Sequence, residues 1–200
     1  TSVTRPASSM KITGTFLDEI THDIPSQNWG PDDWARDFDA MEAVGIDSVI
    51  LIRAGYRDRA TFDSEVLRRH RDMLPAYGDL VDLFLREAGR RDMDLFVGTY
   101  DAGTFWDEGD YRTEVAVNKD FCAEVTERYG DHDAFAGWYI SHEINAYDDE
   151  MLAVYEELAD HLRGLKDVPL LMSPYVKGPK QFGGEALPFD EHVASWAEVF

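Results

Sequence analysis

The run Ala136-Gly137-Trp138-Tyr139-Ile140-Ser141-His142-Glu143-Ile144-Asn145 is the stretch that decides the fold class of this chain. Its apolar and aromatic residues end in a carboxylate, and an acid-rich amphipathic helix is expected a few residues later. A barrel strand presents a functional group in this way, because its packed interior is rigid and its carboxyl end opens into loops. Glu143 is therefore a candidate general acid, and the alternative is a solvated loop carboxylate.

The same strand and helix unit recurs on both sides of this run. Strands are predicted from residue 11 to the acids at 18 and 19, and over 47–53, 94–100, 135–143 and 169–173. Helices are predicted from 31 to a stop at 45, from 80 to 88, from 114 to 129, over 151–162 and from about 190, with a short helix over 64–71. Alternation of this kind predicts an α/β fold with a parallel sheet.

A closed barrel fits the strand ends better than an open dinucleotide-binding sheet. No glycine-rich phosphate loop follows the first strand, whereas polar or aromatic residues follow every strand. An eight-stranded TIM-type barrel needs roughly 250 residues, so we expect only the first five βα units of a (β/α) barrel here. The remaining strands would come from a longer chain. Residues 1–10 are expected to be a disordered or processed stub, and 11–200 the incomplete barrel domain.

Spacing also predicts parts of the core. Trp34, Phe38, Met41 and Val44 recur at helical intervals and are expected to form one buried face. Cys122 is the only cysteine, which rules out an intrachain disulfide, and its apolar neighbours favour a buried, inert thiol.

Composition limits the partners. The formal net charge of −21 makes nucleic-acid binding improbable, because such a surface repels phosphate backbones. No window of about 18 apolar residues exists, so no membrane-spanning helix is expected. The hydrophobic content of 44% is enough to bury one sizeable core. The compartment stays open.

Four stretches of the sequence resemble a known family. They are Thr15-Phe16-Leu17-Asp18-Glu19-Ile20, Asp23-Ile24-Pro25-Ser26-Gln27-Asn28-Trp29-Gly30, Gly45-Ile46-Asp47-Ser48-Val49-Ile50-Leu51-Ile52-Arg53-Ala54-Gly55-Tyr56 and Gly137-Trp138-Tyr139-Ile140-Ser141-His142-Glu143-Ile144. The resemblance is to poorly characterised TIM-barrel proteins of the glycoside-hydrolase-like superfamily, usually described as a domain of unknown function. It implies a sugar-binding cleft with Glu143 as acid/base and a nucleophilic carboxylate on a late strand. The sequence departs from the wider superfamily in two respects: it stops before any late strand, and His142 replaces an asparagine.

Nine further residues are expected to contact a carbohydrate at the strand ends. Asp18, Glu19 and Asp101 are the possible second carboxylates, with loop pinning or ligand contact as the alternatives. Arg53 would bind a ligand or form a salt bridge to Asp18 or Glu19, and we favour the salt bridge. The others are Trp29 and Trp106 as sugar platforms, Tyr56 and Tyr175 as rim hydrogen-bond donors, and His142. Trp138 is expected in the core.

The sequence thus predicts a glycoside hydrolase that uses Glu143 as general acid/base. A non-catalytic glycan-binding barrel is the alternative, and a metal-dependent sugar isomerase or epimerase is the third possibility. His22-Asp23 and His142-Glu143 pair nitrogen with oxygen ligands, but neighbouring strand residues point to opposite faces. No metal and no cofactor are therefore expected.

Overall fold

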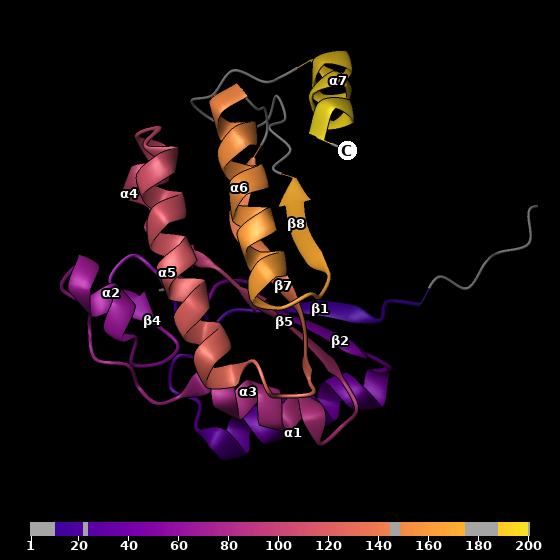
Figure 1. The fold of residues 1–200 in the computed structure, drawn as a ribbon. Helices are drawn as coiled ribbons and strands as arrows, with labels where there is room; N and C mark the ends of the chain where they lie inside the picture. The colour runs from indigo at the N-terminus through magenta and orange to yellow at the C-terminus, as the bar shows by residue number, and fades with distance from the viewer. Residues whose placement is uncertain (1–10, 22–23, 145–148, 175–187, 200) are drawn as a thin grey trace, which may run out of the picture.

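A computed structural model of the chain describes residues 11–21, 24–144, 149–174 and 188–199. Five parallel strands form its main sheet, and their order along the sheet follows the chain (Figure 1). They are β1 (Gly14–Leu17), β2 (Ser48–Leu51), β5 (Asp94–Gly98), β7 (Phe135–Ile144) and β8 (Leu170–Pro174). The sheet is the curled half of a barrel, as the sequence predicted. Since neighbouring strands are parallel, their carboxyl ends share one edge.

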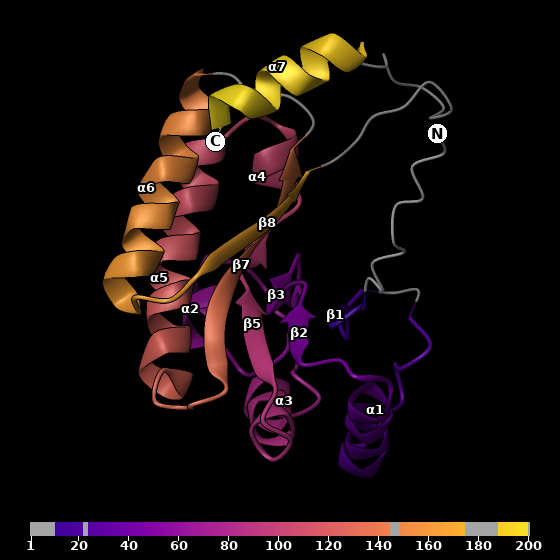
Figure 2. The ribbon, with the colours of Figure 1, turned by 90° about the vertical axis from the view of Figure 1, so that its right-hand side faces the viewer.

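Helices follow these strands along the chain. The longer helices before β8 cover the outer side of the sheet, and the last helix lies beyond the end of β8 (Figures 1 and 2). The helices are α1 (Pro31–Val44), α2 (Glu65–His70), α3 (Leu80–Gly89), α4 (Thr104–Asp107), α5 (Tyr111–Tyr129), α6 (Asp149–Leu165) and α7 (Phe189–Val199). Helices α1 and α3 lie side by side, as do α5 and α6 (Figures 1 and 2). In the described ranges, none of the helices is both long and apolar enough to cross a bilayer.

The core lies between the sheet and these helices. Alternate strand residues such as Leu51, Val97 and Trp138 are fully buried there. Trp34 of α1 packs edge-on against Phe84 of α3, with ring centroids 4.8 Å apart. The predicted placement of Trp138 in the core is therefore confirmed.

Two of the predictions about buried side chains have different outcomes. Cys122 on α5 is fully buried, so the expectation of a buried cysteine is confirmed, and burial raises the pKa of its thiol. The predicted α1 face is correct for Trp34 and Phe38 but wrong for Val44, which is 75% exposed. Val44 is the last residue of α1, beside the left-handed Gly45 that ends the helix. Among the described residues, no neighbouring element covers the helix at this turn.

The inner side of the curled sheet carries a second set of side chains. Phe16 of β1 and Tyr139 of β7 meet there edge to face, at 5.4 Å between ring centroids. Gly137 lies on the same side, and a Cβ atom at this position would come within 2.2 Å of the Phe96 ring. The ring of Phe96 therefore requires glycine at position 137. The pairing of β7 with β8 is irregular between Ile140 and Ile144, and Glu143 lies within this last part of β7.

A second sheet of very short strands lies beyond the ends of β2 and β5. It consists of β3 (Gly55–Tyr56), β4 (Arg59–Ala60) and β6 (Tyr100–Asp101), in the order β4-β3-β6. Strand β3 runs parallel to β6, with Tyr56 opposite Asp101. The third predicted strand, 94–100, is therefore divided: β5 ends at Gly98, and Tyr100 belongs to the small sheet. This sheet fixes Asp101 at the strand-end edge.

Candidate functional site

Glu143 occupies the end of β7 as an exposed side chain. Tyr139 lies four residues earlier on this strand. Burial raises the pKa of the Tyr139 hydroxyl, the negative charge of Glu143 adds to the rise, and the charge of Arg53 opposes it. Both charged groups are thus near enough to act on one tyrosine. The structure brings Glu143 and Arg53, from β7 and the end of β2, to the same region.

Arg53 and Asp101 form an ion pair at this edge. Arg53 Nη1 lies 3.3 Å from Asp101 Oδ2, and both side chains are 18% exposed. The guanidinium also lies over the Tyr56 ring, 4.6 Å from its centroid. The favoured prediction that Arg53 pairs with Asp18 or Glu19 is wrong, because the small sheet places Asp101 closer to it. Arg53, Tyr56 and Asp101 therefore form one cluster at the ends of β2 and β5.

Asp101 also connects to a buried polar cluster that includes His142. Asp101 Oδ1 accepts a hydrogen bond from the Gly103 N–H at 2.8 Å and lies 3.8 Å from His142 Nε2. His142 Nε2 lies 3.1 Å from Glu114 Oε1, and the two side chains are 3% and 1% exposed. His142 therefore contacts the interior beside α5 rather than the open strand edge. His142, which was predicted to bind the ligand, therefore lies on the helix side of β7.

Glu114 and Asn118, which both lie on α5, were not predicted as site residues. Glu114 Oε1 accepts from the Ala102 N–H at 2.9 Å. Asn118 pairs with both backbone groups of Tyr100: its Oδ1 accepts from the N–H at 2.9 Å, and its Nδ2 donates to the carbonyl at 2.8 Å. The available signal was two polar residues, four apart, on an otherwise apolar helix face. Their spacing gives no indication of these partners, which are backbone groups after β5.

The two acids after β1 behave differently from one another. Asp18 Oδ1 accepts from the backbone N–H groups of Ile20 and Thr21 at 3.2 Å each, and Oδ2 accepts from the Thr21 hydroxyl. Asp18 thus pins its own loop. Glu19 is partly buried, and burial raises the pKa of its carboxyl group from 4.5 to about 7, opposed by a hydrogen bond from Ser26 and assisted by the charge of Asp18.

The remaining predicted residues lie elsewhere or outside the description. Trp29 packs edge-on against Trp34 at 4.9 Å between ring centroids, so its ring contacts α1. Trp106 belongs to α4, but its side chain is outside the described part of the structure. Tyr175, His22 and Asp23 lie outside the described residues.

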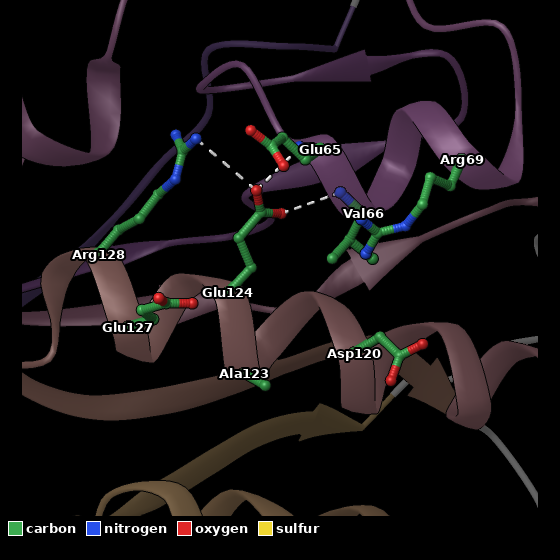
Figure 3. Close-up of a pocket in the computed structure, with 8 residues that line it drawn as sticks. All are labelled: Glu65, Val66, Arg69, Asp120, Ala123, Glu124, Glu127 and Arg128. Atoms are coloured by element: carbon green, nitrogen blue, oxygen red, sulfur yellow. Dashed lines mark hydrogen bonds and ion pairs between the residues drawn. The ribbon is translucent and has the colours of Figure 1, made fainter.

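A groove of about 670 Å³ lies between α2 and α5, and none of the predicted strand-end residues lines it (Figure 3). Glu124 occupies its centre, where Oε1 accepts from the Glu65 N–H at 2.8 Å and Oε2 from the Ser64 hydroxyl at 2.5 Å. Arg128 Nη2 lies 3.7 Å from Oε1. The Glu124 carboxylate therefore accepts hydrogen bonds from the first residues of α2 and caps that helix.

Comparisons with known proteins agree with this architecture. Residues 12–200 match a family model described as Domain of unknown function (DUF4434). No curated protein matches the chain. A crystal structure from Bacteroides thetaiotaomicron VPI-5482, described as a "putative alpha-L-fucosidase", is similar over 100% of this chain, with 38% identity and a TM-score of 0.88. The chain spans 63% of that protein.

Two more distant structures share the fold. One is a glycoside hydrolase family 5 protein from Bacteroides vulgatus ATCC 8482, with 16% identity and a TM-score of 0.51, matched over 73% of this chain and 32% of its own. The other is described as a glycoside hydrolase, with 14% identity and a TM-score of 0.56, matched over 82% of this chain and 43% of its own. Solved structures similar to this half-barrel thus include glycoside hydrolases.

Proposed function

The chain belongs to the DUF4434 family, and from this premise we propose that it forms the catalytic half of a carbohydrate-active barrel, with Glu143 as the general acid/base of a glycoside hydrolase. The observation that carries the proposal is the position of Glu143. It is an exposed carboxylate at the carboxyl end of a largely buried strand, and its charge acts on the Tyr139 hydroxyl of the same strand. Barrel enzymes place their reacting groups at this end of the strands.

The neighbours of Glu143 suit a sugar. Arg53 offers a partly exposed guanidinium that can hydrogen-bond sugar hydroxyl groups, and Asp101 positions it. Tyr56 lies beside them with its ring under the guanidinium. These groups would orient a saccharide while Glu143 donates a proton to the leaving oxygen.

Glycoside hydrolysis by the usual route also needs a second carboxyl group, about 5 to 10 Å from the first. Asp18 is engaged by its own loop, and Asp101 by Arg53 and Gly103. Glu19 keeps its Oε2 without a hydrogen-bond partner among the described residues, although that atom is buried. Of the three strand-end acids, Glu19 is our candidate for the second carboxyl group, and Asp18 and Asp101 are candidates for binding and positioning.

The test is the Glu143→Gln variant, assayed on a panel of 4-nitrophenyl glycosides that includes the α-L-fucoside. The full-length protein should be used, since this chain spans 63% of its 38% identical relative. Loss of the general acid should lower kcat by about 10²- to 10⁴-fold, while folding stays intact because the side chain is exposed. The matched control is Glu42→Gln, an exposed glutamate on α1, which should leave kcat unchanged. Full activity of Glu143→Gln would remove this residue from the mechanism.

A second candidate function is a glycan-binding barrel without hydrolysis. Asp18 and Asp101 favour it, because hydrogen bonds within the protein already use their carboxylates. Binding without turnover would leave the wild-type protein inactive on every glycoside of the panel. Isothermal titration with the same sugars would then give heat of binding that is lost in the Arg53→Ala variant. Turnover of any panel glycoside that depends on Glu143 would exclude this function.

A further inference from the structure

The cluster of Asp101, Glu114 and His142 is built from three different elements. Asp101 belongs to β6, Glu114 to the first turn of α5, and His142 to β7. One ligand atom from each residue, a carboxylate oxygen or an imidazole nitrogen, lies within 4.8 Å of the other two. The side chains of Glu114 and His142 are 1% and 3% exposed, whereas that of Asp101 is 18% exposed. The cluster is therefore enclosed on the helix side and reached through Asp101.

The hydrogen bonds of Glu114 are unevenly divided between its two oxygens. Oε1 faces His142 Nε2 at 3.1 Å, the Ala102 N–H at 2.9 Å and the Asn118 amide at 3.4 Å. Oε2 is buried and has no hydrogen-bond partner among the described residues. A buried carboxylate oxygen without a partner costs about 1 to 3 kcal/mol or more, so this orphan atom requires an explanation.

A direct hydrogen bond from His142 to Glu114 would explain only part of this arrangement. The imidazole N–H would bond to Glu114 Oε1, which already receives two N–H groups, and would leave Oε2 without a partner among the described residues. A cation bound beside His142 can accept electron density from both carboxylates and from the imidazole. It would also offset two negative charges that lie close together in a largely buried site.

We propose that Asp101, Glu114 and His142 bind one divalent transition-metal ion of the Zn²⁺ or Mn²⁺ type. Zinc binds carboxylate oxygen and imidazole nitrogen at about 2.0 to 2.2 Å, which separates ligand atoms around it by about 3.3 Å. The observed separations of 3.1 Å and 3.8 Å from His142 Nε2 are close to that value. One nitrogen and two oxygen ligands suit zinc or manganese better than calcium or magnesium, which prefer oxygen alone.

The surrounding hydrogen bonds would orient these ligands. The Gly103 N–H holds Asp101 Oδ1 at 2.8 Å, and the Asn118 amide approaches Glu114 while it binds Tyr100. Arg53 holds the other Asp101 oxygen. Because two of the three ligands are buried, the ion joins β6, β7 and α5 and is not a site of substrate turnover. The inference is independent of the proposed glycosidase activity.

The test measures metal binding directly. The full chain, freed of its tag and of bound metal by a chelator, is titrated with ZnCl₂ and separately with MnCl₂ in a calorimeter. We expect one ion per chain, and at least a tenfold weaker affinity in Glu114→Gln and in Asp101→Asn. Glu127→Gln, an exposed glutamate on the same helix, should bind as the wild type does. Circular dichroism checks the folding of each variant.

The outcomes separate the two explanations of the cluster. If Glu114→Gln does not fold, Asp101→Asn carries the test, because this side chain is partly exposed. A Co²⁺ spectrum in the visible range that changes in Asp101→Asn would support ligation by this residue. No stoichiometric binding of either ion to the wild-type chain would overturn the proposal in favour of a direct hydrogen bond between His142 and Glu114. Binding that both variants leave unchanged would place the ion elsewhere, and would also overturn it.

Discussion

Glu19 lies at the strand-end edge and has a raised pKa. Its carboxyl group is half-buried, and burial raises its pKa from 4.5 to about 7. A general acid works best when its pKa lies near the working pH, because it is then protonated yet still able to release the proton. Above about pH 7 Glu19 is ionised and can accept a proton from water, which is the role of the second carboxyl group in an inverting hydrolase when Glu143 is the general acid.

The raised pKa of Glu19 predicts a pH-dependent cost. Between pH 4.5 and 7 the folded chain binds a proton that the unfolded chain releases, so stability falls as pH rises through this window. After allowance for partial exposure, we expect a loss of about 1 to 2 kcal/mol from this group. The Glu19→Gln variant should lack that loss. Urea unfolding of both proteins at pH 5 and pH 8 measures the difference, with Glu42→Gln as the control. Equal pH dependence in wild type and Glu19→Gln would contradict the assignment.

At the residue scale, the sequence predicted a side chain's environment better than its partner. Trp138 and Cys122 were placed in the core because spacing alone reports burial. The partner of Arg53 was predicted wrongly, because Asp101 reaches it only through the pairing of β3 with β6. Glu114 was not predicted as a site residue, since the Ala102 N–H that it binds is distant in sequence. Ion pairs of this kind depend on the fold, which no local pattern contains.

Helix α2 is short and takes its N-terminal support from α5. Its first residues direct the N–H groups of Glu65 and Val66 at Glu124, at 2.8 and 3.3 Å, and Ser64 accepts from the Leu67 N–H at 3.0 Å. Six residues are too few to form a stable helix alone, so these contacts determine whether α2 forms. The negative charge of Glu124 also suits the positive end of the helix dipole.

Removal of that carboxylate should therefore unfold α2 locally. The Glu124→Ala variant should lose about 1 to 3 kcal/mol of stability, because it leaves buried or half-buried donors without an acceptor. Amide exchange of Val66 and Leu67 should accelerate by the corresponding factor. Glu127→Ala, an exposed change on the same helix, should stay within about 0.5 kcal/mol of the wild type. Slow exchange of these amides in Glu124→Ala would show that α2 does not depend on this cap.

Elements of ordinary length were predictable, and the shortest ones were not. Strong apolar runs and helix stops predicted β2, β7, α1 and α5 nearly to their ends. Strands β3, β4 and β6 have two residues each, which is too short for any alternation to be read. They form because the chain after β2 meets the chain after β5, so they follow from the barrel itself.

The charge of the whole molecule predicts a response to salt. A formal net charge of −21 on 200 residues means that carboxylates repel one another across the folded surface. Raising NaCl from about 20 mM to about 0.5 M shortens the Debye length from over 20 Å to roughly 4 Å, and should raise the melting temperature by several degrees. KCl at equal ionic strength should act alike, because the effect is screening. A melting temperature that falls or stays constant would contradict this prediction.

The half-barrel was predictable as a class because parallel strands with polar ends leave few alternatives. The sequence predicted an incomplete barrel with an open inner side, but it did not predict which exposed apolar side chains lie there. Phe16 and Leu171 are 50% and 37% exposed there, and β1 and β8 are the edge strands of the described sheet. The register of the strands decides which side chains face the inner side, and the composition of the strands does not contain this information.

The pairing of β3 with β6 joins the segment that follows β2 to the segment that follows β5. The Arg57 N–H donates to the Asp101 carbonyl at 2.8 Å, and Arg71 binds the carbonyl of Ala102 at 3.1 Å. An insertion or deletion between residues 54 and 60 would consequently shift Asp101, and with it His142 and Glu114, although all three lie far along the chain. Evolution of a new specificity on this rim would therefore proceed more readily by exchange of side chains than by change of loop length.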